Sequence, residues 1–142
     1  MPTSDKKKPK NTKRSIWPKL ITFTLLLLFA AVAISLLPRS FQQDTSIIGK
    51  GTNVVVLMLD PVLVQGTETV IAMNEVRDEY EGRLEFIISN INTPEGRLFY
   101  RTHDLRSNAL VFFAANGERL EIVYAPQVAE SLRNNVNRIF KY

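Results

Sequence analysis

An uncharged, apolar run near the start of the chain constrains its architecture more than any other feature. No charged side chain occurs between Leu20 and Leu37, and only two threonines and one serine interrupt the apolar residues. A helix of this length, rising about 1.5 Å per residue, almost crosses a hydrocarbon core about 30 Å thick. Trp17 precedes the run, at a place where interfacial aromatic residues are typical of membrane proteins. The run therefore predicts a transmembrane helix over residues 17–38, with Leu20 to Leu37 in the bilayer.

Charge is distributed unevenly around this run. Residues 1–19 hold seven lysines and arginines against one aspartate, whereas residues 39–142 hold eleven against thirteen acidic residues. Because positive charge collects on the cytoplasmic side of membrane proteins, we expect residues 1–16 to form a basic cytoplasmic tail and the C-terminal region to be extracytoplasmic. The inner (plasma) membrane of a bacterial cell is the default location, and a photosynthetic membrane such as the thylakoid is the alternative. The acidic C-terminal region gives little support for nucleic-acid binding.

A cleaved signal peptide is the alternative interpretation of the same run. It has a positively charged start, an apolar stretch and the small-residue motif Ala31-Val32-Ala33. The apolar residues continue past this motif as far as Leu37, which favours a retained anchor. Under the alternative, the C-terminal region is released as a soluble exported chaperone or binding protein.

The remaining residues predict a linker and one domain. Residues 39–52 are mostly polar, with glycines near their end, and predict a linker in which Ile47-Ile48 can add a short strand. Residues 53–142 then alternate between apolar, β-branched runs and segments of helical periodicity. The predicted strands are residues 53–59, 84–89, 109–113 and 119–124, and the predicted helices are residues 67–81, 94–103 and 126–140. Thr67 and Thr93 are the expected caps of the first two helices.

This order of elements predicts a three-layer α/β/α sandwich. The first two strands are joined through a helix, so we expect them to be parallel with a right-handed crossover. The last two strands are separated by Asn116-Gly117, a signal for an antiparallel hairpin. The result is a mixed central sheet with two helices on one face and one helix on the other.

Composition excludes several kinds of chemistry. The chain has no cysteine, which excludes disulfides, thiolate catalysis and cysteine-ligated metals. His103 is the single histidine, which argues against a catalytic triad and against a histidine-rich metal site. We therefore expect no catalytic residue, no metal and no cofactor. His103 with Asp104 is interpreted as a solvated helix end.

Three stretches of the domain resemble thioredoxin. EVRDEYEGRLEF at 75–86 resembles the end of the active-site helix and the strand that follows it. SNINTPEG at 89–96 resembles a strand end and helix start of the family, and NALVFFAANGERL at 108–120 resembles its hairpin. Their order and spacing extend the resemblance over about residues 50–140. The chain thus resembles a membrane-anchored member of the thioredoxin-like fold superfamily, which implies the same three-layer sandwich.

The resemblance implies that the functional residues of that family are missing here. The Cys-x-x-Cys motif falls on Leu63 to Gly66, so both thiol positions are empty. The buried aspartate that assists proton transfer falls on Leu57, and the cis-proline falls on Asn108. We therefore expect a redox-inactive protein that acts as an accessory, an assembly factor or a small subunit of a membrane protein complex. An oxidoreductase accessory that relies on a partner's thiols is a weaker alternative.

The loops that replace the active site are the candidate partner-binding surface. In the fold that the chain resembles, residues 61–66 lie beside residues 105–108, where active relatives hold an extended peptide. The predicted partner-binding residues are Val62, Leu63, Val64, Gln65, Ser107 and Asn108. The other interpretation is that Leu63 and Val64 fold inward and fill the space of the lost side chains. Because a cis bond before a residue other than proline costs about 2.5–4 kcal/mol, we predict that the Ser107–Asn108 bond is trans.

An acidic cluster near the end of the first predicted helix is interpreted as a solvated face with ion pairs. Its residues are Arg77, Asp78, Glu79, Glu81 and Arg83.

Overall fold

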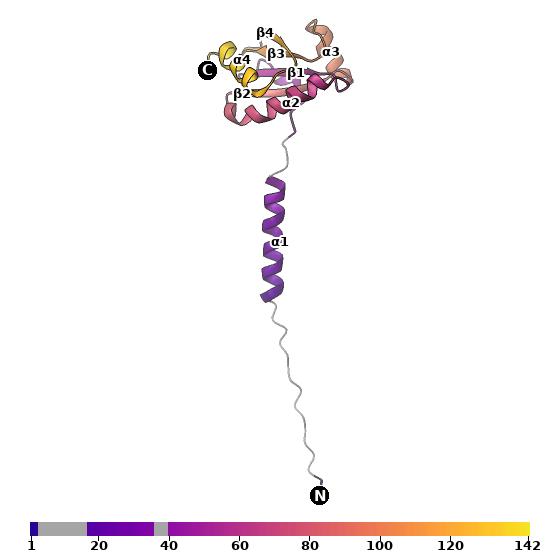
Figure 1. Ribbon diagram of the computed structural model, residues 1–142, viewed down its shortest axis with the longest axis vertical. Coiled ribbons are helices and arrows are strands. Elements are labelled where there is room, and N and C mark those ends of the chain that lie inside the picture. Colours follow the sequence, from indigo (N-terminus) through magenta and orange to yellow (C-terminus); the bar gives the residue numbers. More distant parts are fainter. Residues whose placement is uncertain (3–16, 36–39) are drawn as a thin grey trace. The chain divides into compact units, whose positions relative to one another are not determined.

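The computed structural model describes residues 1–2, 17–35 and 40–142. Two compact units, residues 1–39 and 40–142, divide the chain, and each is described by itself. Most of the predicted basic tail, and the last residues of the predicted transmembrane span, lie outside the described residues. Helix α1, Trp17–Ser35, is continuous over 19 residues (Figure 1). Its side chains from Leu20 onward are exposed. Within the described ranges, no helix combines the length and apolarity needed to cross a membrane.

The second unit is built on one mixed sheet of four strands in the order β2-β1-β3-β4. Strand β1 pairs in parallel with β2 and antiparallel with β3, and β3 pairs antiparallel with β4. The strands are β1 Asn53–Leu59, β2 Leu84–Asn90, β3 Ala109–Phe113 and β4 Arg119–Tyr124. The bounds, the parallel pairing of β1 with β2 and the β3–β4 hairpin confirm the sequence prediction, with β2 one residue longer than expected.

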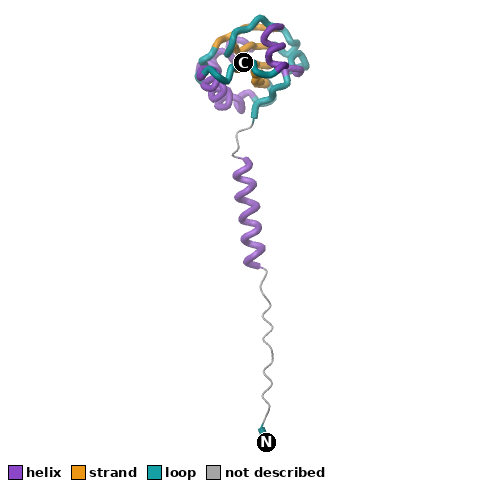
Figure 2. Tube along the Cα trace, turned by 90° about the vertical axis from the view of Figure 1, so that its right-hand side faces the viewer, coloured by secondary structure: helices purple, strands orange, loops and turns teal. Residues whose placement is uncertain are grey.

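Helices cover both faces of the sheet (Figure 2). They are α2 Val64–Val76, continued by the 3₁₀ turn η2 Arg77–Tyr80, then α3 Pro94–Thr102 and α4 Ala129–Phe140. One apolar cluster joins Val55 and Leu57 of β1 to residues of α2 and α4, whereas another joins Val56 and Met58 to Phe99 of α3. Strand β1 is therefore buried on both faces, and the predicted division of two helices against one is confirmed.

Two predicted helix starts are corrected by the structure. Helix α2 begins at Val64 rather than Thr67, because Asp60 closes a turn just before it: the Val62 N–H donates to Asp60 Oδ1 at 3.1 Å, and the Leu63 N–H donates to the Asp60 carbonyl at 3.1 Å. Thr67 is therefore inside the helix and is no cap. Helix α4 begins at Ala129 rather than at residue 126, after a non-helical stretch over residues 125–128.

The third helix begins as predicted. The Thr93 hydroxyl accepts a hydrogen bond from the Gly96 N–H at 3.0 Å, and Pro94 occupies the first helical position. This arrangement satisfies one of the free N–H groups of the first turn and uses a residue that has no N–H to satisfy.

Residues 40–52, predicted as part of a linker, pack against the domain instead. The Ile88 N–H donates to the carbonyl of Gln42 at 3.0 Å, so this segment covers the outer edge of β2. Phe41 packs on the cluster under α2 and α4, while Ile47 and Ile48 pack on the cluster under α3. Residues 45–47 form a 3₁₀ turn and no strand. The apolar side chains explain the correction, because burying them on both faces of the sheet attaches the segment to the domain.

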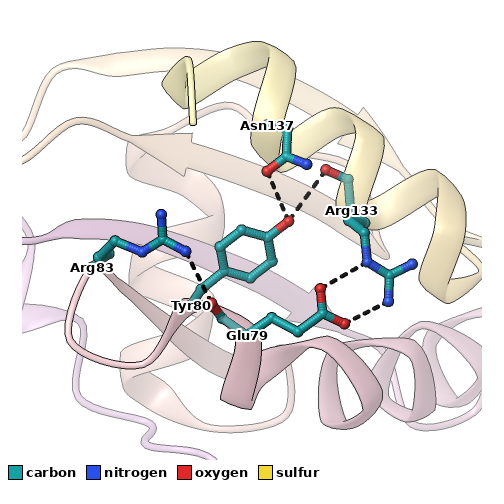
Figure 3. Close-up of polar contacts among 5 residues, drawn as sticks. All are labelled: Glu79, Tyr80, Arg83, Arg133 and Asn137. Carbon is teal, nitrogen blue, oxygen red and sulfur yellow. Dashed lines mark hydrogen bonds and ion pairs between the residues drawn. The ribbon is translucent and has the colours of Figure 1, made fainter.

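Hydrogen bonds and an ion pair join η2, which continues α2, to α4 (Figure 3). The Tyr80 hydroxyl donates to Asn137 Oδ1 at 2.9 Å, and Arg133 donates to both carboxylate oxygens of Glu79. The Arg83 guanidinium donates to the backbone carbonyl of Glu79 at 3.0 Å. Glu79 therefore pairs with the neighbouring helix, rather than with the arginines of its own segment as the interpretation of the acidic cluster implied.

The single histidine packs against aromatic rings at the end of α3. The ring centroid of His103 lies 4.4 Å from that of Phe99 and 5.3 Å from that of Phe113. Burial lowers the pKa of His103, and the positive charge of Arg119 lowers it further. The side chain is half-buried rather than fully solvated.

We predict that His103 makes the domain less stable as the pH falls from about 7 to about 5. The unfolded chain takes up a proton near the ordinary histidine pKa of about 6.5, whereas the folded chain takes it up only at lower pH, so acid favours the unfolded state across this window. Denaturant unfolding of the full chain at several pH values measures the effect.

The substitution His103→Gln is expected to flatten the pH dependence in that window. Arginine partners also lower the pKa of Glu79 and Glu121, but these groups lose their contribution only as the pH falls below their unfolded values, near 4.3. An equal pH dependence in wild type and His103→Gln between pH 7 and 5 contradicts the assignment.

Candidate functional site

Three loops meet at the carboxyl end of β1. The Asp60 N–H donates to Asn108 Oδ1 at 3.0 Å, which joins the loop 60–63 to residues 105–108. The Ala125 N–H donates to the carbonyl of Asn108 at 3.0 Å, which adds the loop 125–128. The structure thus brings the first two loops together as the sequence predicted. The third was missed because residues 126–128 had been assigned to a helix.

Asn108 is the residue that holds the three loops. Besides these two hydrogen bonds, its own N–H donates to the Met58 carbonyl at 2.8 Å. The residue is only 5% exposed, and its φ of 58° lies in the left-handed region that asparagine tolerates better than most residues. Its N–H, carbonyl and Oδ1 are therefore engaged within the domain, and its contact with a partner stays a prediction.

The peptide bond before Asn108 is trans, as predicted. Within the described residues, only the Ala125–Pro126 bond is cis. Proline holds φ near −65° and lacks an N–H, so it could provide neither the φ of Asn108 nor its hydrogen bond to Met58. The residue that replaces the family's cis-proline thus has a different backbone conformation and a different set of contacts.

Gly66 lies directly against the side chains of Asn108 and Leu59. A Cβ atom at this position would lie 2.6 Å from Asn108 Oδ1 and 2.6 Å from Leu59 Cδ1, closer than real contacts allow. The resemblance to thioredoxin assigns the second cysteine to this position. The side chains of Asn108 and Leu59 therefore fill the space that a thiol would enter.

The loop before Gly66 faces outward. Val62 is 82% exposed, Leu63 40% and Val64 69%, and Gln65 is exposed as well. This exposure contradicts the interpretation that Leu63 and Val64 fold inward as filler. Ser107 is half-buried at the rim of the same surface. The third loop adds two exposed apolar residues, Pro126 and Val128.

The arrangement offers little acid–base or metal chemistry. The carboxylate of Asp60 accepts the Val62 N–H and so serves the turn. In the parts of the chain that the structure describes, no three histidine, cysteine, aspartate or glutamate side chains lie close enough together to hold a metal ion. What the surface presents is exposed apolar side chains around a closed, hydrogen-bonded centre.

Comparison with known proteins identifies the fold. Neither a protein-family profile nor a curated protein matches the sequence. Among solved structures, the solution structure of a thioredoxin from Thermus thermophilus is similar, with a TM-score of 0.61 and 12% sequence identity. The match covers 73% of this chain and 88% of that one. At this identity the likeness shows the fold alone: the domain is thioredoxin-like.

We predict that Asn108→Ala destabilises the domain by about 1–3 kcal/mol. The change leaves the part-buried Asp60 N–H without its acceptor and places alanine in the left-handed region. Asn108→Gly removes the same acceptor but tolerates the backbone, so it is expected to cost less than alanine. Denaturant unfolding of the full chain measures both variants.

The neighbouring substitution Ser107→Ala is the matched control and is expected to change the free energy of unfolding by less than about 0.5 kcal/mol. If Asn108→Ala is as mild as this control, Asn108 does not hold the loops together.

Proposed function

We propose that the chain is a redox-inactive, membrane-anchored protein whose thioredoxin-like domain binds a protein partner. In this role it acts as an accessory, an assembly factor or a small subunit of a membrane protein complex. One observation carries the proposal: the surface that corresponds to the thioredoxin active site is closed at Gly66 and Asn108 but exposes Val62, Leu63 and Val64.

The absence of thiol chemistry is supported by more than the missing cysteines. Restoring a cysteine at residue 66 would bring its Cβ against Asn108 and Leu59. At the position of the family's proton-transfer aspartate, Leu57 is fully buried in the cluster under α2 and α4. Packing has thus replaced the thiol, the acid and the proline together, which fits a domain that works without catalysis and without a cofactor.

Protein binding is supported by the exposed apolar side chains. Burying apolar area is the main source of association free energy, at about 25 cal/mol per Å². The loop 62–64 presents such side chains on a rigid base, because Asp60 and Asn108 fix the backbone at its start. A preorganised surface loses less conformational entropy when a partner binds.

Membrane anchoring is supported by the apolar run and by its flanking charge. The run from Leu20 to Leu37 extends beyond the last described residue of α1, Ser35. Within its own unit, the described apolar side chains of α1 are exposed, with Phe29 74% exposed. The basic residues before the run favour a cytoplasmic N-terminus and an extracytoplasmic domain in the inner (plasma) membrane or a photosynthetic membrane.

We predict that the full-length chain stays in the membrane fraction after extraction with alkaline carbonate. Its intact mass is expected to include the apolar run, and protease added from the extracytoplasmic side is expected to reach the domain. A soluble mature chain that begins near Ile34 contradicts the anchor and supports the exported binding protein.

We predict that a partner co-purifies from mild detergent with wild type and much less with the double variant Val62→Ser, Val64→Ser. Both side chains are exposed, so the fold should tolerate the change. A subunit co-purifies in fixed stoichiometry, whereas an assembly factor is found with immature forms of a complex.

Insulin reduction above background by the purified chain contradicts the redox-inactive assignment.

A further inference from the structure

The outer face of α2 carries a line of alternating apolar and acidic residues. Val64, Glu68, Ile71 and Glu75 follow one another at intervals of four, three and four residues, which places them in one row along a helix. All four are exposed, and Ile71 is 55% exposed. The buried residues of the same helix are Gly66, Thr69, Ala72, Met73 and Val76.

This row continues the loop of the candidate site. Val64 is both the first residue of α2 and part of the exposed loop that begins at Val62. The row of exposed apolar and acidic side chains therefore extends from the loop 62–64 along α2.

The acidic residues on this side keep their charge free for a partner. Among the described residues, Glu68, Glu75 and Asp78 form no ion pair, since the acidic side chains that do so are Glu79 and Glu121. Figure 3 shows the carboxylate of Glu79 turned to Arg133 of α4.

The arginines next to these acids face aromatic rings. The guanidinium of Arg83 lies 4.8 Å from the ring centre of Tyr142, and that of Arg77 lies 4.5 Å from the ring centre of Phe41. Residues 64–81 hold five acidic residues against Arg77 alone. Within α2 itself the charged residues are Glu68 and Glu75, both exposed in the row with Val64 and Ile71, so this side of the helix is acidic as well as apolar.

The helix on the other face of the sheet has a different surface. Helix α3 exposes Leu98, which is 68% exposed, between Arg97 and Arg101. Its surface thus combines an exposed leucine with basic neighbours, which makes it a matched internal control for the acidic and apolar face of α2.

We propose that the surface formed by Val62, Val64, Glu68, Ile71, Glu75 and Asp78 docks a protein segment that carries both apolar and basic side chains. The inference rests on the proposed function, because it names the chemistry of the partner at that site. Val62, Val64 and Ile71 supply apolar area, and the carboxylates select for lysine or arginine. The same carboxylates repel anionic lipid headgroups, which argues for a protein occupant rather than the bilayer surface.

Two synthetic peptides test the charge requirement. Both place leucines along one face of an 18-residue helix of about 27 Å; one carries lysines on its other positions and the other carries glutamates. The full chain is held in nanodiscs of neutral phosphatidylcholine, and binding is measured by fluorescence anisotropy. We expect the lysine peptide to bind, with an affinity that falls as salt is added, and the glutamate peptide to bind at least about tenfold more weakly.

Variants on the two helices locate the binding. Ile71→Ser and the pair Glu68→Gln, Glu75→Gln are each expected to weaken the lysine peptide by about threefold to tenfold. Leu98→Ser on α3 is the matched control and is expected to leave its affinity unchanged. Equal binding of the two peptides, or equal losses for Ile71→Ser and Leu98→Ser, overturns the proposal.

Photo-crosslinking in cells separates this inference from the proposed function. A photoreactive residue is placed at position 71, 98 or 128 of the full chain. The proposal is supported if position 71 forms adducts with a protein that presents a basic, apolar segment. These adducts should be lost when Glu68→Gln and Glu75→Gln are introduced together. Adducts only at 98 overturn it but leave partner binding intact, whereas no protein adduct at any position overturns the proposed function. Adducts between two copies of this chain at 71 also overturn the proposal, since the occupant is then a second copy.

Discussion

Three hydrogen bonds of one buried asparagine join the three loops at the carboxyl end of β1. Asn108 bonds to Met58 at the end of β1, to Asp60 at the start of the exposed loop, and to Ala125 after β4. A buried polar group has to be paired, and here each pairing ties down a different segment. The end of β1, the start of the exposed loop and the segment after β4 are thus joined through this residue.

The site has a closed, hydrogen-bonded centre and an exposed apolar loop beside it. At Gly66, the Asn108 and Leu59 side chains lie so close that they would have to shift to admit a Cβ atom. In the loop before Gly66, Val62 and Val64 are exposed, and the row of acidic and apolar residues on α2 continues from Val64. The closed centre and the exposed side chains beside it are the two observations on which the proposed function rests.

The architecture was predictable because it depends on residue patterns that act locally. Strand β1 is an unbroken apolar run that needs cover on both faces, and Thr93-Pro94 starts α3 through its own cap. The placement of two helices on one face of the sheet and one on the other then follows from the order of elements. The positions of the loops 60–66 and 105–108 were also predictable, because the resemblance to thioredoxin places them side by side.

What could not be predicted depends on contacts between distant residues. The early start of α2 follows from the turn that Asp60 closes, and the attachment of residues 40–52 follows from burial of Phe41 and Ile48 against a finished sheet. The buried role of Asn108 is of the same kind, since its partners lie far away in the sequence. The sequence alone does not show whether an asparagine is exposed or buried, because its burial depends on the assembled fold.

Amide hydrogen exchange at Asp60 in the full-length chain tests this account most directly. The Asp60 N–H belongs to a surface loop, but it donates to the side chain of Asn108, a residue 5% exposed. The account predicts that this amide is protected nearly as strongly as the amides of β1, because it exchanges only when the centre of the three loops opens. Exchange at the rate of an unprotected loop amide would contradict the closed site on which the proposed function rests.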